Sequence, residues 1–518
     1  MGLARLLDRV GQAPGRGAQP LHRRDGDTAS GHSLARRRDR SRGGRAPGRR
    51  GAPHHLARAR AASAVARGCR GRLPARLGAG AAVTQPWVVG NRWDARDGHR
   101  PDPLPLVSVI VSHFDQPAEL ARTLHALAAQ DYPRHLLEVV VADDGSPGAV
   151  DVPEGVILVR QEDRGFRLAA VRNLGVRASS GEVLCFVDAD TAPEPGYVRA
   201  LSRLPALLPE AVTVGRRRHA DFSDLPVDVP VVEAARGREL AEPAWLAEEY
   251  ARSRDLLDAD DRSYRFMIGA VIGCSRRLFD EVGGFDESFT SYGGEDWEWA
   301  HRMWRAGAVF AHVPDAVAWH DGPEWADRDG SGMDRANAQT LRLQAAIPVP
   351  GSAPRAVWSG AADLVVRVQG DHSAAALFIA ADSLWGALPR ARLVLDAVPD
   401  VLQGDPRAVV ASAGPSAGVD ARVTWLLERP VVVLDPAWIV DVVRRLGTGD
   451  VGAVELMADD GSSLGVLTSR RAARRAERWG DSRGFETARM PAVGVHALRA
   501  DPRVEAWVGG WGGVESFC

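Results

Sequence analysis

The chain has 518 residues, 45 % of them hydrophobic and 25 % charged, which predicts a globular protein of two or three domains. The formal net charge of −2 conceals an asymmetry, because the first hundred residues hold 22 Arg against six Asp. Every fixed cation is Arg, since the chain contains no Lys. No run approaches the roughly 18 apolar residues that span a membrane, and the arginine-rich start lacks the apolar core of a secretory signal.

The cysteines also constrain the class of protein. Cys69, Cys185, Cys274 and Cys518 lie far apart with no paired spacing, which argues against a disulfide framework and against a zinc site. We therefore expect a cytoplasmic protein without a transmembrane segment. Peripheral contact with the inner face of the membrane is left open.

Residues 1–83 consist mainly of Arg, Gly, Ala and Pro in irregular blocks with few large apolar side chains. Such a segment cannot bury enough surface to order itself, so we expect a disordered extension or a start assigned too early. The alternative is an arginine-rich arm for nucleic acid or an anionic membrane. No aromatic platform accompanies the arginines, and we expect no nucleic-acid partner.

Alternating strand and helix patterns follow in a predicted domain of residues 84–346. Apolar runs at 106–112, 137–142, 156–159 and 183–187 predict buried strands, and leucines at helical spacing predict a helix in the first interval. Strand, helix and strand at this spacing form a βαβ unit, hence an α/β fold with a parallel sheet. Ligands of such sheets bind beyond the carboxyl ends of the strands.

Residues 347–518 repeat the opening of this pattern. A strand at 363–369, a helix at 373–388 and a strand at 392–395 match its order and lengths, and residues 431–435 stand where the fourth strand is expected. The tail at 510–515 echoes a Gly-Gly-Glu block. We therefore expect a second, degenerate copy of the fold, the alternative being an unrelated α/β domain.

Two acidic clusters follow predicted strands. Asp143 and Asp144 follow the second strand, where a carboxylate can accept hydrogen bonds from a nucleobase or ribose, although Asp-Gly is also a common turn. Asp188 and Asp190 follow the fourth strand. Two carboxylates at this spacing can hold Mg²⁺ or Mn²⁺ together with substrate phosphates.

A third cluster reads Gly293-Gly294-Glu295-Asp296-Trp297. The glycines allow the backbone to approach a ligand closely, and the aromatic face of Trp297 suits a sugar. The alternative is that Glu295 and Asp296 are ordinary acids at the start of a helix.

Two single residues complete the candidates. His320 follows an apolar run at 316–319 and is expected at the same edge, whereas His312 is expected to be structural. Arg172 carries a guanidinium suited to a donor diphosphate, the alternative being a solvated helix charge.

Taken together, residues 105–325 resemble the family 2 glycosyltransferases of the GT-A fold. The resemblance rests on six motifs in the family's order, at residues 107–112, 143–146, 172–175, 186–190, 282–286 and 293–296. The Gly-Gly-Glu-Asp block also resembles β-1,4-galactosyltransferases and chondroitin-type polymerases, whose donors are UDP-galactose or UDP-N-acetylhexosamines. One departure is that Ser112-His113-Phe114-Asp115 replaces the usual Pro-x-Tyr-Asn.

The resemblance implies a transfer of a hexose or N-acetylhexosamine from a nucleotide-sugar, with UDP expected, to a hydroxyl of a glycan or other acceptor. It implies Mn²⁺ or Mg²⁺ as cofactor and an inverting displacement, with retention left open. The implied roles are donor binding by Asp143, Asp144, Arg172 and Asp188, metal binding by Asp188, Asp190 and His320, catalysis by Asp296 as base with Glu295, and acceptor binding by Trp297 and Gly294.

The sequence also bears on two other functions. A sugar nucleotidyltransferase would need a glycine-rich, cation-bearing loop after the first strand, and residues 112–117 have neither. A non-catalytic carbohydrate- or partner-binding protein is disfavoured by the intact acidic pairs. In the second copy, Asp435 lacks a second aspartate two residues later, and residues 459–462 are expected to be a turn. We therefore expect the second copy to be non-catalytic.

Overall fold

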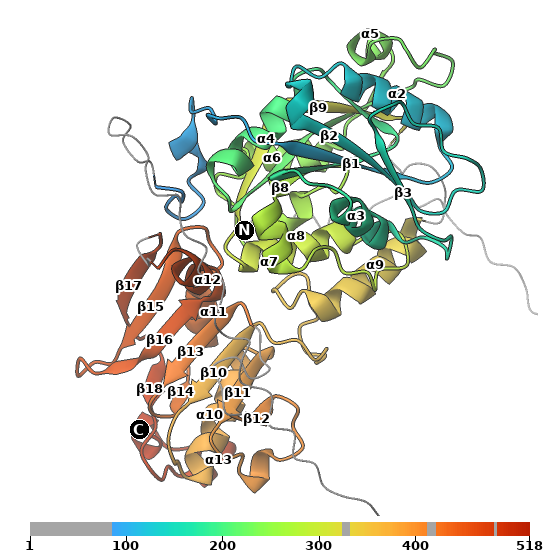
Figure 1. Cartoon of the computed structure of the whole chain (residues 1–518). Helices are drawn as coiled ribbons and strands as arrows, with labels where there is room; N and C mark the ends of the chain where they lie inside the picture. Colours follow the sequence, from blue (N-terminus) through green and yellow to red (C-terminus); the bar gives the residue numbers. More distant parts are fainter. Residues whose placement is uncertain (1–84, 324–331, 412–420, 481–483) are drawn as a thin grey trace, which may run out of the picture. The chain divides into compact units, whose positions relative to one another are not determined.

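The computed structural model describes residues 85–323, 332–411, 421–480 and 484–518 (Figure 1). These residues belong to one compact unit with a nine-stranded and a seven-stranded sheet. The predicted disordered extension, residues 1–83, lies outside the described residues. Among the described helices, none has the length and apolar character needed to cross a bilayer.

The nine-stranded sheet has the order β3-β2-β1-β4-β8-β6-β9-β5, with β7 paired to β6. Strands β1 to β4 pair in parallel, as predicted, whereas β8 runs antiparallel to both β4 and β6. The strands are β1 (Val107–His113), β2 (Leu137–Asp143), β3 (Ile157–Arg160), β4 (Val183–Asp188), β5 (Thr191–Pro193), β6 (Ala211–Ala220), β7 (Glu239–Leu240), β8 (Val271–Ser275) and β9 (Val309–Asp321). The four apolar runs read from the sequence are confirmed as strands within one or two residues.

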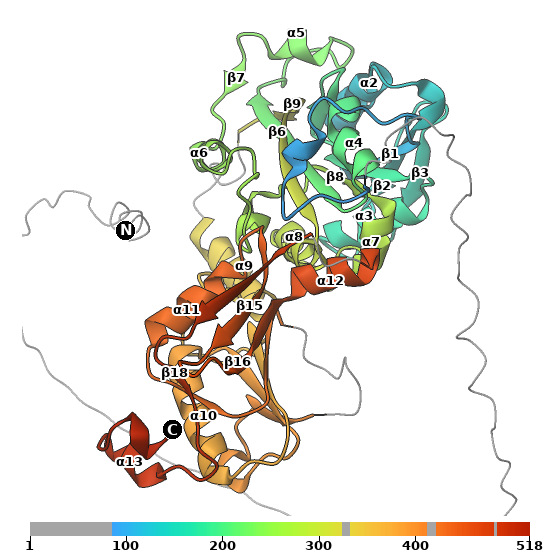
Figure 2. The same cartoon turned by 90° about the vertical axis from the view of Figure 1, so that its left-hand side faces the viewer.

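Helices cover both faces of this sheet. They are α2 (Pro117–Ala128), α3 (Leu168–Arg177), α4 (Tyr197–Leu207), α5 (Val231–Ala235), α6 (Ala244–Arg252), α7 (Arg276–Val282), α8 (Glu295–Arg305) and α9 (Gly332–Ala346). Figures 1 and 2 show α3, α7 and α8 on one side of the sheet and α2 on the other. On the α8 side, the buried Phe186 ring of β4 contacts Phe279, Phe285 and Trp299, with centroids 5.6, 5.3 and 6.5 Å away. This aromatic cluster fixes α8, and with it the acidic residues at its start.

The seven-stranded sheet has the order β12-β11-β10-β13-β16-β15-β17. Its elements are β10 (Leu364–Val368), α10 (Ala374–Ala387), β11 (Ala391–Leu395), β12 (Ala408–Val410), β13 (Val423–Leu427), β14 (Val431–Val433), α11 (Pro436–Arg445), β15 (Val451–Met457), β16 (Ser463–Ser469), α12 (Arg470–Trp479), β17 (Glu486–Pro491), β18 (Val495–Ala497) and α13 (Val504–Gly509). Strands β10 to β13 are parallel, β16 is antiparallel to β13 and β15, and β17 is parallel to β15. The same order and directions occur in the first sheet from β3 to β9.

Two sequence-based assignments in this region were wrong. The fourth strand of the second sheet is β13, and residues 431–433 form the short strand β14, which pairs with β18 outside that sheet. The tail at 510–515 follows β18, whereas the helix between β16 and β17, in the place of α8, is α12. Residues 510–515 and strand β14 therefore do not occupy the positions at which the first sheet carries its acidic clusters.

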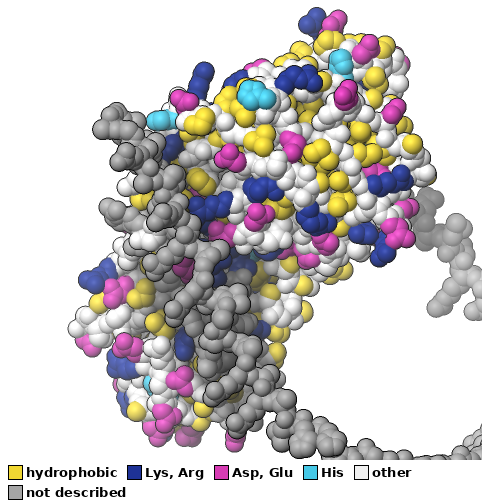
Figure 3. All heavy atoms as spheres, in the orientation of Figure 1, with side chains coloured by type: hydrophobic (Ala, Val, Ile, Leu, Met, Phe, Trp, Pro, Cys, Tyr) yellow, Lys and Arg dark blue, Asp and Glu magenta, His cyan; other side chains and the backbone are white. Residues whose placement is uncertain are grey.

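Helix α12 packs against the first sheet through arginines. Arg475 and Arg478 contact the carboxylate of Glu210, which is fully buried, at 2.7 and 3.1 Å. The Trp479 indole N–H also donates to Glu210, at 2.8 Å. Elsewhere, on the face drawn in Figure 3, basic and acidic side chains are interspersed. The buried cluster is different, because one carboxylate holds two guanidinium groups away from water.

We predict that Glu210→Ala lowers the free energy of unfolding by about 3–5 kcal/mol, because it leaves buried guanidinium groups without their counter-charge. Denaturant unfolding of the full chain measures the loss. The control is Glu477→Ala, which removes the exposed partner of Arg474 and is expected to cost at most about 1 kcal/mol. Equal losses in the two variants would contradict the buried pairing.

Candidate functional site

Strand register brings the acidic clusters to one edge of the large sheet. His113 at the end of β1 stands opposite Asp143 of β2, and Ser112 stands opposite Asp188 of β4. On the other side of the site, β5 and β9 are antiparallel with Thr191 opposite His320. The predicted convergence at the carboxyl ends of the strands is therefore present in the structure.

A cavity of about 530 Å³ opens at this edge. Asp144, Asp188 and Asp190 contribute to its lining, together with the aromatic rings of Phe166 and Tyr292, whose centroids are 5.7 Å apart. Its other lining residues are Ser112, His113, Phe114, Gln116, Asp163, Gly165, Leu168 and Val171. A lining that combines carboxylates with aromatic rings suits a ligand with a polar, cation-associated part and a flat ring.

Asp143 does not line this cavity, because its oxygens are occupied within the protein. It is fully buried and accepts hydrogen bonds from the backbone N–H and the hydroxyl of Ser146 and from His113 Nδ1 at 2.9 Å. The backbone N–H of Gln116 donates to His113 Nε2, so Nδ1 carries the proton. Burial alone would raise the pKa of Asp143, but these hydrogen bonds lower it below its usual value. Asp143 thus fixes the loop that follows β2.

Asp144 is the member of that pair that lines the cavity. Its carboxylate accepts from the side chain of Gln161 and from the backbone N–H of Arg167, the latter at 2.9 Å. Burial raises the pKa of Asp144, although these donors partly oppose the shift. Each oxygen has one protein partner, which leaves acceptor capacity for a ligand.

Asp190 and His320 face each other across the end of the sheet. The distance from Asp190 Oδ2 to His320 Nε2 is 3.5 Å, and the Gln116 amide donates to the same oxygen at 3.3 Å. His320 Nδ1 lies 3.2 Å from the carbonyl of Gly322, which can only accept, so Nδ1 carries a proton. Burial would raise the pKa of Asp190, but hydrogen bonding to His320 and Gln116 lowers it to about 2.

Asp188 and Glu295 are joined by one cation. Arg172 of α3 is 1 % exposed, and its Nη2 and Nη1 donate to Asp188 Oδ1 and Glu295 Oε1, each at 3.0 Å. Burial and the neighbouring Asp296 raise the pKa of Glu295, while Arg172 acts in the opposite direction. Arg172, predicted to bind the donor, is held by these two carboxylates and does not contribute to the cavity lining.

The predicted metal ligands therefore only partly converge. Asp190 and His320 are adjacent, whereas Asp188 is tied to Arg172 through one oxygen and has a side chain 29 % exposed. Within the described ranges, no group of three or more His, Cys, Asp or Glu side chains is arranged to hold a metal ion.

Asp296 is held at the start of α8 by two backbone donors. Its oxygens accept from Gly269 N–H at 3.0 Å and from Trp297 N–H at 2.8 Å. Burial raises the pKa of Asp296. The Trp297 ring packs edge-on against Tyr264, with centroids 6.1 Å apart. The bond to Trp297 is that of an ordinary helix-start acid, whereas the bond to Gly269 reaches a different segment.

The two glycines before α8 adopt a conformation that side chains disfavour. Gly293 and Gly294 have φ of 91° and 96°, and a Cβ on Gly294 would lie 3.2 Å from Leu343 of α9. Gly294 is buried at the start of the helix. The pair is therefore required by backbone geometry and by the close approach of α9.

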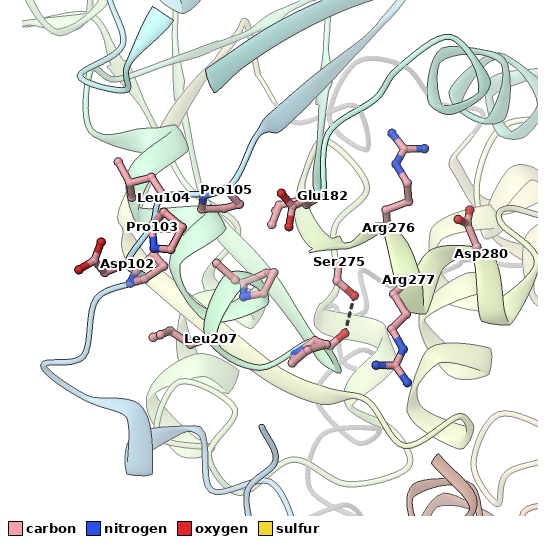
Figure 4. A pocket seen from close by; sticks show the side chains of 15 residues that line it. Asp102, Pro103, Leu104, Pro105, Glu182, Leu207, Ser275, Arg276, Arg277 and Asp280 are labelled. Atoms are coloured by element: carbon pink, nitrogen blue, oxygen red, sulfur yellow. Dashed lines mark hydrogen bonds between the residues drawn. The ribbon is translucent and has the colours of Figure 1, made fainter. Parts of the chain in front are cut away.

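A larger cavity, of about 730 Å³, lies at the opposite ends of β1 and β4 (Figure 4). Two of its polar residues, Ser275 and Arg276, have structural partners. Ser275 donates to the Pro209 carbonyl and caps α7 by accepting from Leu278 N–H, and Arg276 donates to the Gly181 carbonyl at 2.7 Å. We place the chemistry at the smaller cavity, where Asp144, Asp188 and Asp190 of the acidic motifs converge.

Several residues of the site were missed from the sequence. Phe166 and Tyr292 are isolated aromatics in loops, without a pattern that marks them. Gly269 carries no motif, although its N–H orients Asp296. Phe114 lies in the segment that departs from the family pattern, and that departure was the one available signal.

Comparisons with known proteins show which families this chain resembles in sequence. Residues 108–282 match the model of the family described as Glycosyl transferase family 2, and residues 256–318 match that of the N-terminal domain of galactosyltransferase. These matches confirm the predicted resemblance and the predicted enzyme class, a glycosyltransferase.

Curated relatives match over part of their length. The chain is 30 % identical over 265 residues to a chondroitin synthase of Escherichia coli, covering 46 % of this chain and 37 % of that protein. It is 30 % identical to a hyaluronan synthase of Pasteurella multocida, covering 42 % and 24 %, and 32 % identical to a validoxylamine A glucosyltransferase of Streptomyces hygroscopicus subsp. jinggangensis, covering 39 % and 51 %. The chain thus spans between about a quarter and half of the length of these relatives.

Two solved structures are also similar. One is GalNAc-T7 with UDP, GalNAc and Mn²⁺, at 21 % identity and a TM-score of 0.34, covering 43 % of this chain and 45 % of that one. The other is the mannosyltransferase PcManGT from Pyrobaculum calidifontis with GDP-Man and Mn²⁺, at 22 % identity and a TM-score of 0.34, covering 49 % and 66 %.

We predict that Gly294→Ala lowers the free energy of unfolding by about 1–3 kcal/mol, because alanine at this φ is strained and its methyl meets Leu343. Gly360→Ala is the matched control, since its φ of 91° is similar but its Cβ would meet no atom within 4 Å. Denaturant unfolding of both variants measures the two losses: Gly360→Ala reports the backbone strain alone, and Gly294→Ala reports the strain together with the contact with Leu343. A smaller loss at Gly294 than at Gly360 would contradict the packing of α9 there.

Proposed function

We propose that this chain, whose residues 108–282 match the family 2 glycosyltransferases, transfers a sugar from a nucleotide-sugar to an acceptor hydroxyl. The observation that carries the proposal is the placement of Asp144, Asp188 and Asp190 around one cavity with an aromatic rim. A nucleotide-sugar combines a flat base, a ribose and a diphosphate. The aromatic rim suits the base, Asp144 suits the ribose, and Asp188 and Asp190 with a cation suit the diphosphate.

For the donor, we assign the base and ribose to the Asp144 side of the cavity. Asp144 keeps acceptor capacity, and the ring of Phe166 offers a flat face beside it. We propose a UDP-sugar carrying a hexose or N-acetylhexosamine. The names of the relatives, chondroitin synthase and hyaluronan synthase, support a glycan acceptor.

For the cofactor, the residues present fit a divalent cation. With Nδ1 of His320 directed at the Gly322 carbonyl, Nε2 faces Asp190 Oδ2 at 3.5 Å, and either a proton or a cation between these two atoms satisfies both. Asp190 and His320 would hold Mn²⁺ or Mg²⁺, with donor phosphates and the exposed oxygen of Asp188 as further ligands. The cation would stabilise the negative charge of the departing diphosphate.

For the transfer itself, we assign the base to Asp296. Two backbone N–H groups fix its carboxylate, and its raised pKa makes it a better proton acceptor than an ordinary aspartate. The acceptor hydroxyl would lose its proton to Asp296 as its oxygen attacks the anomeric carbon opposite the leaving diphosphate, with inversion. Glu295 and Trp297 would orient the acceptor at the Gly294 turn.

We assign residues 347–518 to a degenerate, non-catalytic copy of the same fold. Its strand order repeats that of the first sheet, but the turn after β13 is Glu428-Arg429-Pro430, where proline offers no side-chain ligand. Asp435 caps α11 by accepting from two backbone N–H groups, and Asp459 lies in an exposed turn.

The proposal is tested by screening UDP- and GDP-sugars for release of the nucleoside diphosphate with Mn²⁺, with Mg²⁺ and with EDTA. We expect release from at least one UDP-sugar in the presence of metal. The absence of both release and nucleotide binding across the screen would contradict the proposed function.

We predict that Asp190→Asn weakens UDP binding in Mn²⁺ by more than about tenfold, to the affinity measured in EDTA, because it removes a charged ligand without changing volume. Isothermal titration of UDP measures this. Asp459→Asn, in the exposed turn of the second copy, is the matched control and should bind UDP like the wild type. Full metal dependence in Asp190→Asn would exclude Asp190 as a ligand.

We predict that Asp296→Asn lowers the limiting rate of transfer by roughly 10²–10⁴-fold with donor affinity unchanged, because the amide cannot accept the proton. In the wild type, the rate should fall as the pH is lowered through the raised pKa of Asp296, hence at a higher pH than for an ordinary aspartate. Initial rates across pH check both. A helix-start role alone would instead change stability by about 0.3–1 kcal/mol and leave the rate near wild type.

A further inference from the structure

A buried guanidinium joins two carboxylates that come from different parts of the fold. Arg172 lies on α3, with Asp188 at the end of β4 bonded to Nη2 and Glu295 at the start of α8 bonded to Nη1. Both distances are 3.0 Å, and the guanidinium is 2 % exposed. One side chain therefore ties the strand that leads to Asp190 to the helix that carries Asp296.

The position of this guanidinium is fixed on its other sides. Its Cζ lies 5.4 Å from the centre of the Phe285 ring. A Cβ on Gly269 would lie 2.9 Å from both Nη atoms, so only glycine leaves the present room. The N–H of the same glycine donates to Asp296. Gly269 therefore contacts both Arg172 and the carboxylate assigned as base.

The contacts of Arg172 also argue against a direct role in binding the donor. Both terminal nitrogens are engaged with carboxylates, and the residue is absent from the lining of the donor cavity. Glu295 depends on Arg172, because its other oxygen, Oε2, is buried with no hydrogen-bond partner. A buried carboxylate that loses its only cation is strongly destabilised.

We propose that Arg172 is a positioning residue that sets the distance between the donor side of the site, at Asp188, and the acceptor side, at Glu295 and Asp296. This inference rests on the proposed function. It replaces the expectation that Arg172 binds the donor diphosphate, and it adds Gly269 as the residue whose missing side chain permits the bridge.

Gly269→Ala tests the proposal while it preserves every charge. The added methyl displaces the guanidinium, and we expect the limiting rate of UDP release from the best donor of the screen to fall about 10- to 100-fold. The dissociation constant of UDP in Mn²⁺, measured by titration, should change by less than about threefold. Gly386→Ala, whose Cβ would meet no atom within 4 Å, is the matched control and should leave both quantities unchanged.

Arg172→Lys provides a second variant that keeps the charge. A single ammonium cannot reproduce the fork that reaches both carboxylates, so we expect a similar loss of rate with UDP binding retained. In the double variant the methyl at 269 has no guanidinium to displace. The two losses should therefore not multiply, and the double variant should be within about threefold of Arg172→Lys.

Three results would overturn the inference and leave the proposed function intact. A rise of tenfold or more in the UDP dissociation constant of Gly269→Ala, with its rate unchanged, would place Arg172 on the donor. A lowered melting temperature with an unchanged rate would leave it a purely structural role. If the losses of rate multiply in the double variant, Gly269 and Arg172 act independently and the bridge does not link them. A wild type that neither binds UDP nor releases it from any UDP-sugar would contradict the proposed function itself, and the role of Arg172 would fall with it.

Discussion

The geometry of the site depends on one cation held among three carboxylates in the interior. Arg172 is drawn by Asp188, Glu295 and Asp296, and the attraction is strong because water is largely excluded around it. Burying a charge is costly, and here the cost is offset only while the end of β4 and the start of α8, which carry the three acids, stay in place. The bridge therefore links the order of strand β4 to the order of helix α8. Local shifts in one are resisted by the other, which is a useful property where two substrates must meet at a set separation.

Much of the first sheet could be predicted because its strands are long, apolar runs. Residues 107–113 and 183–187 are buried along their whole length, which gives a continuous signal. The second sheet shows the opposite case. Strand β13 alternates buried and exposed residues, with Thr424 and Leu426 facing outward, so the fully buried run at 431–433 was mistaken for it. The error displaced the expected equivalents of the acidic motifs, while the underlying expectation of a repeated strand order agrees with the observed topology.

The candidate site likewise has features that the sequence predicts and features that it does not. Motifs at strand ends converge because the register of parallel strands carries them there, and that much follows from sequence. The distinction between Asp143 and Asp144 does not follow, because it depends on which carboxylate His113 and Ser146 reach across the sheet. The partner of Arg172 was equally inaccessible, since Glu295 is 123 positions away and the guanidinium could as well have pointed to solvent. Sequence identifies the chemical groups, and only packing assigns their partners.

The position of β9 has a consequence for synthesis of the chain on the ribosome. Strands β1 to β4 can pair as soon as they emerge, since each finds its parallel neighbour among residues 107–188. The short strand β5, which directly follows Asp190, pairs only with residues 318–320 of β9, and β6 likewise lies between β8 and β9. A nascent chain halted before residue 318 would therefore hold the wall around Asp144 but not the edge that brings Asp190 and His320 together. The site would be completed late, and β5 and β6 would lack their β9 partner until then, the interval in which such strands are prone to mispair.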